Sequence, residues 1–194
     1  MSNKEGFEKR EKGKFKGNRF YQLSRANSLG DFEQEKLMSM EITTCKTNFT
    51  LDTDNSYHNT KVYSLIKKSD CQYSYSYLLA ILNSSLFWWF LYTTGDTLSG
   101  DARTVKTNYI FPFHLPKYDK DYDKTLTQLV EMRMTSGNEK YETLIDLFVM
   151  KSYNLDFDEV KTINSLYDDT YKGLYDNICL GMSKDELEEI VNRS

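Results

Sequence analysis

The sequence predicts an α+β protein: a small mixed or antiparallel sheet with a core helix, followed by amphipathic helices. Short segments that alternate apolar and polar residues precede residue 73, whereas apolar residues after residue 121 recur at helical spacing. Between them lies segment 73–91, YSYSYLLAILNSSLFWWFL, which concentrates more apolar and aromatic surface than any other segment. Because burying this surface should contribute more to stability than burying any other segment, we expect segment 73–91 to form the core.

The composition is that of a globular protein, with 39% hydrophobic and 28% charged residues among 194. The net charge of −4 is unevenly distributed. Residues 1–117 carry 16 Lys and Arg against 12 Asp and Glu, and residues 118–194 carry 9 against 17. Residues 1–30, with 8 basic and 3 acidic residues, suit a polyanion. The alternative is a solubilising tail.

Three cysteines without zinc-like spacing argue against a disulfide framework and indicate a reducing, cytoplasmic setting. The apolar run 77–92 is interrupted by polar residues and is shorter than the roughly 20 residues that span a bilayer. We therefore expect no membrane association.

The first part of the chain predicts a lead-in and short strands. Residues 1–17 lack apolar periodicity and predict a flexible basic lead-in, with order beginning near Phe20. Segments 19–25 and 35–44 predict extended structure. The positions expected to be buried in the second are Leu37, Met38, Met40 and Ile42.

A hairpin is predicted next, because segments 48–53 and 57–67 flank the turn-forming residues 52–56. Segment 74–92 predicts one core helix, with a bend at the Asn83-Ser84-Ser85 triplet. Its two tryptophans, Trp88 and Trp89, are expected to be buried.

A polar loop with two glycines follows this helix and ends at Pro112 and Pro116, which break regular structure. Acidic amphipathic helices begin near Tyr122, with a break at 136–138. Asp156 or Asp158 is a candidate N-cap, and Ser183 with Glu186 forms a capping-box pattern.

Catalytic patterns are absent from the sequence. Two histidines, His58 and His114, are too few for a His-based metal cluster, and no GxGxxG or GxxxxGK[ST] motif occurs. Residues 119–130 lack the glycine and glutamate of a calcium loop. The sequence Glu159-Val160-Lys161 is interpreted as a solvated helix face.

Three segments together resemble one family: RFYQLSRANSLGDFEQEKLMSMEITTCKTNFTLDTDNSYHNTKVYSLI, YLLAILNSSLFWWFLYTTGDTLSGDARTVKTNYIFPFHLP and KYETLIDLFVMKSYNLDFDEVKTI. They resemble the C-terminal target-recognition domain of adenine-specific type II restriction–modification enzymes, the TaqI-like specificity domain. The resemblance covers roughly residues 20–163. The exit Phe111-Pro112-Phe113-His114-Leu115-Pro116 has one residue more between its prolines than the family's tight version.

The resemblance implies a target-recognition core over 18–117 and an acidic helical segment over 118–194, packed on that core or on a catalytic partner domain. The implied partners are double-stranded DNA and a methyltransferase or nuclease domain in cis or in trans. The Asn/Asp-Pro-Pro-aromatic tetrapeptide of adenine methyltransferases is absent here. We therefore expect no cofactor in this chain, with S-adenosylmethionine and magnesium belonging to separate catalytic domains, and leave open whether the chain has enzymatic activity of its own.

The candidate DNA contacts are polar and basic residues of the loop 93–106 and of the basic segment near the N-terminus. Fork-like Arg and short hydroxyls suit base edges, and Lys and Arg suit phosphates. The candidates are Lys16, Asn18, Arg19, Tyr21, Gln22, Arg25, Lys46, Thr97, Ser99, Asp101, Arg103 and Lys106.

Two alternatives remain. Exposed aromatic residues would also suit a protein–protein interaction module, with the basic segment as a soluble tail. A half-specificity subunit of a multisubunit restriction system would bind DNA and assemble through its helices.

Overall fold

The computed structural model describes residues 29–193 and has the predicted α+β fold. The predicted lead-in 1–17, the extended segment 19–25 and the onset of order near Phe20 lie outside these residues. Contacts divide the chain into two units, 1–34 and 35–194. The described part of the first is a 3-10 helix, η1 (Leu29–Glu33). All the other described helices and strands belong to the second unit.

Two small antiparallel sheets form the first half of this unit. Their strands are β1 (Lys36–Met40), β2 (Ile42–Thr43), β3 (Thr50–Asp52), β4 (Val62–Leu65) and β5 (Arg103–Thr104). One sheet has the order β3-β1-β4 and the other joins β2 to β5. Leu37 in β1 lies opposite Leu51 on one side and Leu65 on the other.

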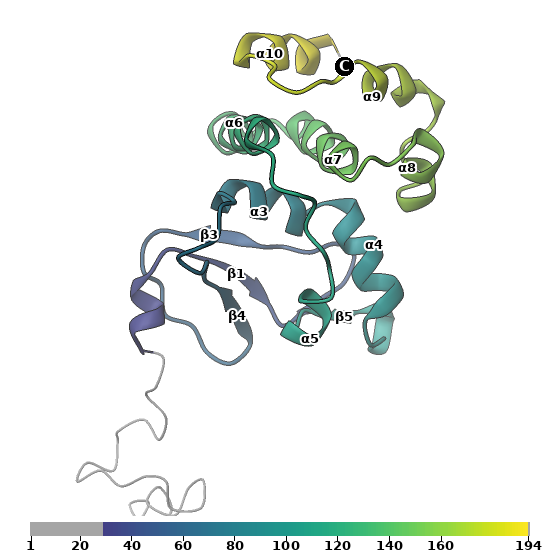
Figure 1. The fold of residues 1–194 in the computed structure, drawn as a ribbon. Coiled ribbons are helices and arrows are strands. Elements are labelled where there is room, and N and C mark those ends of the chain that lie inside the picture. The colour runs from purple at the N-terminus through teal and green to yellow at the C-terminus, as the bar shows by residue number, and fades with distance from the viewer. Residues whose placement is uncertain (1–28, 194) are drawn as a thin grey trace, which may run out of the picture. The chain divides into compact units, whose positions relative to one another are not determined.

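The predicted hairpin between 48–53 and 57–67 is wrong, because β1 lies between the two strands (Figure 1). The turn chemistry itself is present: Asp52 accepts a 2.9 Å hydrogen bond from the Ser56 backbone N–H, and Asn55 has a φ of 57°. The turn closes locally, but β1 is the strand that pairs with both partners.

Burial along β1 and β2 also differs from the prediction. Leu37 is buried and Met38 half-buried, but Met40 and Ile42 are each 48% exposed. Lys36 is buried instead, and its ammonium donates to the Asp52 carboxylate on β3. Cross-strand charge pairing, which alternation in one segment does not reveal, allows a lysine to take a core position.

Segment 74–92 forms two helices, α3 (Tyr75–Leu82) and α4 (Ser85–Thr94), in place of one bent helix. The break is defined by a cap, since the Ser84 hydroxyl accepts a 3.1 Å hydrogen bond from the Phe87 N–H. Trp88 is half-buried, and the prediction that Trp89 is buried is wrong, because it lies on the outer face of α4 and is 40% exposed.

The remaining helices are η2 (Ser99–Asp101), α5 (Thr107–Ile110), α6 (Lys120–Ser136), α7 (Lys140–Ser152), α8 (Phe157–Ile163), η3 (Asp169–Tyr171), α9 (Lys172–Asn177) and α10 (Lys184–Arg193). The predicted break is the left-handed Gly137, and the predicted caps at Asp156 and Ser183 are formed.

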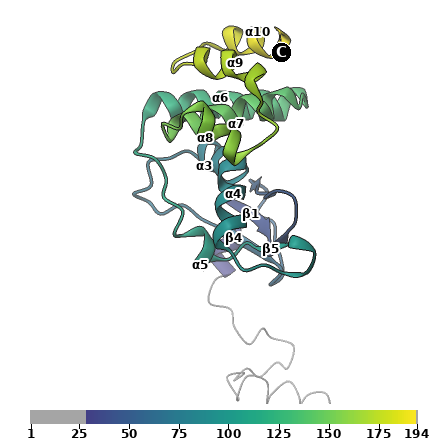
Figure 2. The same ribbon diagram turned by 90° about the vertical axis from the view of Figure 1, so that its right-hand side faces the viewer.

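Helix α3 lies between the three-stranded sheet and the α6–α7 pair, and α9 and α10 lie beyond α7 (Figures 1 and 2). One apolar cluster joins α3 with α6 through α10, and a second joins α4 with β1, Phe49, Val105 and α5. None of the described helices combines the length and apolar character needed to cross a bilayer.

Candidate functional site

The loop between α4 and α5 has a defined backbone. Thr97 forms a bridge with Arg103, and the Leu98 N–H donates to the Ala102 carbonyl at 2.9 Å. Between these contacts, Gly100 and Asp101 have φ angles of 70° and 58°, which turn the chain back on itself. β5 then pairs with β2, which attaches the loop to the sheet region.

Three predicted contact residues lie exposed in this turn: Thr97, Ser99 and Asp101. Their hydroxyl and carboxylate groups can donate or accept hydrogen bonds at the surface. The structure therefore brings short polar side chains together on one exposed turn.

Arg103, another predicted contact residue, is buried, whereas a side chain that contacts a DNA groove must be exposed. It is 4% exposed, and its guanidinium stacks over the Tyr92 ring with the Cζ atom 4.0 Å from the centroid. It donates to the backbone carbonyls of Tyr92, Asp101 and Ala102 at 3.0, 2.9 and 3.2 Å. Its role as a base contact stays a prediction.

Lys106 is half-buried and lies 3.7 Å from the Glu41 carboxylate. Glu41 also pairs with Lys61 at 3.1 Å, and the hydrogen bond from Lys61 holds the pKa of Glu41 below its ordinary value. Two lysines therefore share one carboxylate beside the loop, so these three side chains together carry a net charge of +1. The sequence contained no signal for this pairing, because Glu41 lies 20 and 65 positions from the two lysines.

A second contact missed by the sequence closes the base of the loop. The Tyr109 hydroxyl on α5 donates a hydrogen bond to the Asp96 carboxylate, and this bond raises the pKa of Tyr109. Because Asp96 lies two residues after the last residue of α4, the bond connects the start of the loop to α5.

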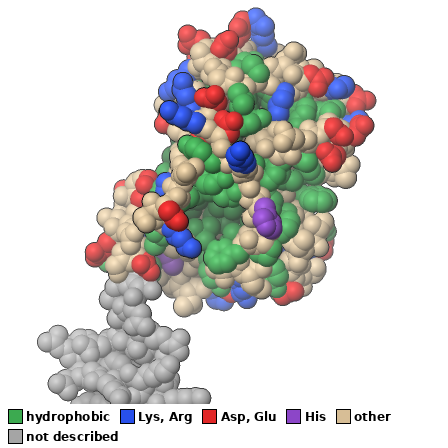
Figure 3. Space-filling view, viewed as in Figure 1, with side chains coloured by type: hydrophobic (Ala, Val, Ile, Leu, Met, Phe, Trp, Pro, Cys, Tyr) green, Lys and Arg blue, Asp and Glu red, His purple; other side chains and the backbone are tan. Residues whose placement is uncertain are grey.

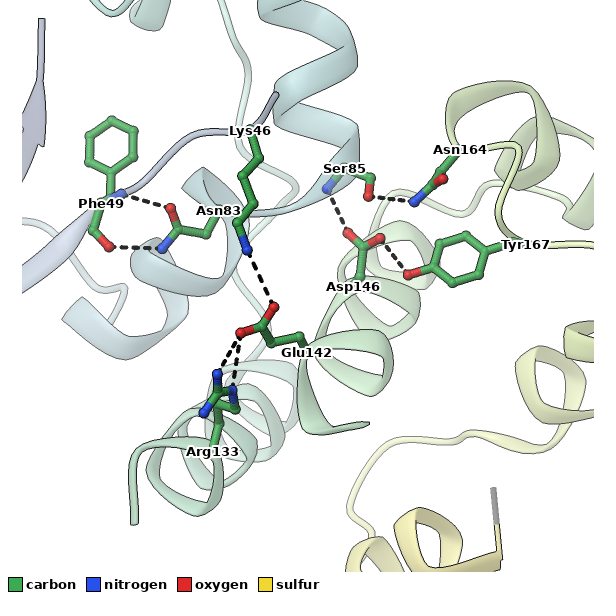
Figure 4. Close-up of polar contacts among 9 residues, drawn as sticks. All are labelled: Lys46, Phe49, Asn83, Ser85, Arg133, Glu142, Asp146, Asn164 and Tyr167. Carbon is green, nitrogen blue, oxygen red and sulfur yellow. Dashed lines mark hydrogen bonds and ion pairs between the residues drawn. The ribbon is translucent and has the colours of Figure 1, made fainter. Parts of the chain in front are cut away.

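Lys46 does not join the loop residues. Its ammonium lies 3.5 Å from Glu142 on α7, which also accepts hydrogen bonds of 3.1 and 2.8 Å from Arg133 on α6 (Figure 4). Lys46 is 70% exposed in its side chain, so it remains accessible. The other predicted contacts, Lys16, Asn18, Arg19, Tyr21, Gln22 and Arg25, lie outside the described residues.

The helical layer differs in its surface from the sheet region. On the face shown in Figure 3, acidic and basic side chains gather over the C-terminal helices, whereas apolar side chains form a broad area below them. With 17 acidic residues against 9 basic ones in residues 118–194, the helical segment repels a polyanion. Within residues 29–193, no group of three His, Cys, Asp or Glu side chains is placed to hold a metal ion.

A family model described as the TaqI-like C-terminal specificity domain matches residues 4–114. The match covers more than half of the chain and includes both sheets, α3, α4, the loop and α5. It ends at His114, before the acidic helices begin. No curated protein matches the chain.

Proposed function

The chain belongs to the TaqI-like C-terminal specificity domain family, and from that premise we propose that it is a sequence-specific DNA target-recognition module of a restriction–modification enzyme. The family match is the observation that carries the proposal. The exposed polar turn within the matched region supports it.

In the proposed mechanism, basic side chains bind phosphates and place the module on duplex DNA. The candidates for these contacts are Lys106, Lys61, which shares the Glu41 carboxylate with it, and the basic residues of segment 16–25. Thr97, Ser99 and Asp101 would then meet base edges in the major groove. Enzymes that modify a base take it out of the helix, so the module would hold the surrounding duplex while a separate domain receives the base.

The methyltransferase or nuclease chemistry belongs, in this proposal, to a catalytic domain in cis or in trans. S-adenosylmethionine and magnesium would bind there, since this sequence lacks the Asn/Asp-Pro-Pro-aromatic tetrapeptide. The acidic helices would face away from DNA or toward that domain. Such an enzyme would act in the cytoplasm, where its DNA is.

The test measures binding of the purified chain to duplex DNA by fluorescence anisotropy, over a series of salt concentrations. Selection from a random duplex library supplies the preferred site, and a scrambled duplex is the control. We expect tighter binding to the selected site and a negative slope of log affinity against log salt, about 0.9 per phosphate contacted. Absence of binding even at low salt would contradict the proposal.

The half-specificity alternative predicts a different assembly. Light scattering of the chain with and without a methyltransferase subunit separates the two, because that alternative requires a complex formed through the helices. A module fused to its own catalytic domain needs no such separate subunit.

A further inference from the structure

Arg103 joins the C-terminal turn of α4 to the tight turn that precedes β5. Its Nε–H donates at 3.0 Å to the carbonyl of Tyr92, in the last turn of α4. Its Nη1 group donates at 2.9 and 3.2 Å to the carbonyls of Asp101 and Ala102, directly before β5. One planar side chain therefore links the end of α4 to the turn at residues 99–102.

The surroundings of the guanidinium fix its position. Tyr92 provides both a carbonyl acceptor and a ring, with the Arg103 Cζ 4.0 Å from the ring centroid. Thr43 lies opposite Arg103 in the β2–β5 pair and is buried as well. A lysine could not reproduce this arrangement, because its ammonium has no planar fork and no flat face for stacking.

The bonds of Arg103 end at the strained part of the loop. Asp101 adopts a φ of 58°, in a region that non-glycine residues seldom occupy. Its carbonyl is one of the guanidinium's acceptors. The hydrogen bond thus stabilises the backbone conformation that turns Ser99 and Asp101 outward.

We infer that Arg103 is a positioning residue, which holds the loop in its reading conformation before DNA arrives, and that the exposed side chains of Thr97, Ser99 and Asp101 make the specific contacts. The inference rests on the proposed function for its DNA consequence. Its structural part, a loop held by a buried guanidinium, stands independently. A buried, fully oriented arginine of this kind raises specificity by pre-organisation, without neutralising a phosphate.

The experiment compares Arg103→Lys, Arg103→Ala and Tyr92→Leu with the wild-type chain. Hydrogen exchange reports the Leu98 amide, which bonds to the Ala102 carbonyl inside the loop. We expect exchange at this amide to accelerate by about tenfold in Arg103→Lys and by less in Tyr92→Leu, which keeps the backbone acceptor. Circular dichroism checks that each variant is folded. If Arg103→Ala does not fold, the two single variants Arg103→Lys and Tyr92→Leu are sufficient for the test.

DNA binding provides the second readout. We expect Arg103→Lys to lower affinity for the selected duplex by about tenfold, to leave affinity for a scrambled duplex unchanged and to leave the salt slope unchanged. A phosphate contact would instead keep the affinity for both duplexes nearly unchanged in Arg103→Lys, because lysine retains the charge, and would lose about 0.9 of the salt slope in Arg103→Ala. A base contact would lower specific affinity with no change in exchange at Leu98.

Either of those two patterns would overturn the inference, as would unchanged exchange in a folded Arg103→Lys variant. If the wild-type chain binds no DNA but Leu98 still exchanges faster in Arg103→Lys, the proposed function fails while the positioning of the loop by Arg103 stands.

Discussion

The Asp146 carboxylate on α7 accepts a 2.7 Å hydrogen bond from the backbone N–H of Ser85, the first residue of α4 (Figure 4). Its second oxygen accepts a 2.7 Å hydrogen bond from the Tyr167 hydroxyl. Asp146 is 6% exposed, and burial raises its pKa. α4 is thereby anchored at its N-terminus by a buried acid, and at its C-terminus by Arg103.

Replacing Asp146 with Asn tests this anchor. The variant keeps one acceptor oxygen but places an NH₂ group against one of the two donors, the Ser85 N–H or the Tyr167 hydroxyl, so one hydrogen bond is lost. We therefore expect the free energy of unfolding to fall by about 2 kcal/mol. Urea denaturation measures the change. Glu142→Gln is the matched control on the same helix, because its ion pairs are exposed and contribute about 1 kcal/mol or less. Equal losses in the two variants would contradict the anchoring role.

The side-chain amide of Asn83 forms the two backbone hydrogen bonds that a neighbouring strand would otherwise form with Phe49. It accepts from the Phe49 N–H at 2.8 Å and donates to the Phe49 carbonyl at 2.9 Å. We expect Asn83→Ala to lower the free energy of unfolding by about 1–3 kcal/mol and to accelerate exchange of the Phe49 amide. Asn192→Ala, at an exposed position on α10, is the control and should have neither effect.

Acid should destabilise the protein through Asp52. Hydrogen bonds from Lys36 and then Ser56 lower the pKa of Asp52 from 3.8 to about 2. Because the folded pKa is the lower one, the stabilisation is present above pH 3.8 and is lost as pH falls toward 2. Asp146, whose pKa is raised, acts in the opposite direction, since protonation relieves the cost of burying its charge.

Thermal midpoints between pH 6 and pH 2 test this sign. We expect the wild-type chain to lose more stability than Asp52→Asn over the acidic part of the range, so that the difference between the two shrinks as pH falls. Parallel curves would show that Asp52 is not a source of the acid dependence.

Replacing an exposed residue of the turn should weaken sequence-specific binding without changing the phosphate contacts. We expect Ser99→Ala to weaken binding to the selected duplex by about 1 kcal/mol, through one lost hydrogen bond, and to leave the salt slope unchanged. Ser165→Ala is the control, because Ser165 is an exposed serine in the acidic helical segment. A variant indistinguishable from wild type would remove Ser99 from the candidate contacts.

Replacing Lys16 should instead weaken binding to every DNA sequence. As a phosphate contact it should, when replaced by Ala, weaken binding to selected and scrambled duplexes equally and reduce the salt slope by about 1. Lys184→Ala removes the same charge from α10, where Lys184 lies 3.6 Å from Glu131, and should leave binding unchanged. Loss of affinity for the selected duplex alone would contradict a phosphate contact.

Local chemistry made several features predictable. The turn at 52–56, the caps at Asp156 and Ser183 and the break at Gly137 depend on residues within a few positions of one another. Features that depend on distant partners were missed or misplaced. β1 lies between β3 and β4, Lys36 is buried because Asp52 lies across from it, and Met40 is exposed.

The sequence by itself determined the α+β class, the family, and the loop in which exposed polar residues would be found. Only the tertiary structure decided that Arg103 turns inward and that Asp146 supports α4 from another helix. The physical reason is that an arginine or aspartate is polar in any sequence pattern, and whether it faces solvent depends on the acceptors and donors that folding brings to it. For Arg103 those acceptors are backbone carbonyls of its own loop and of α4.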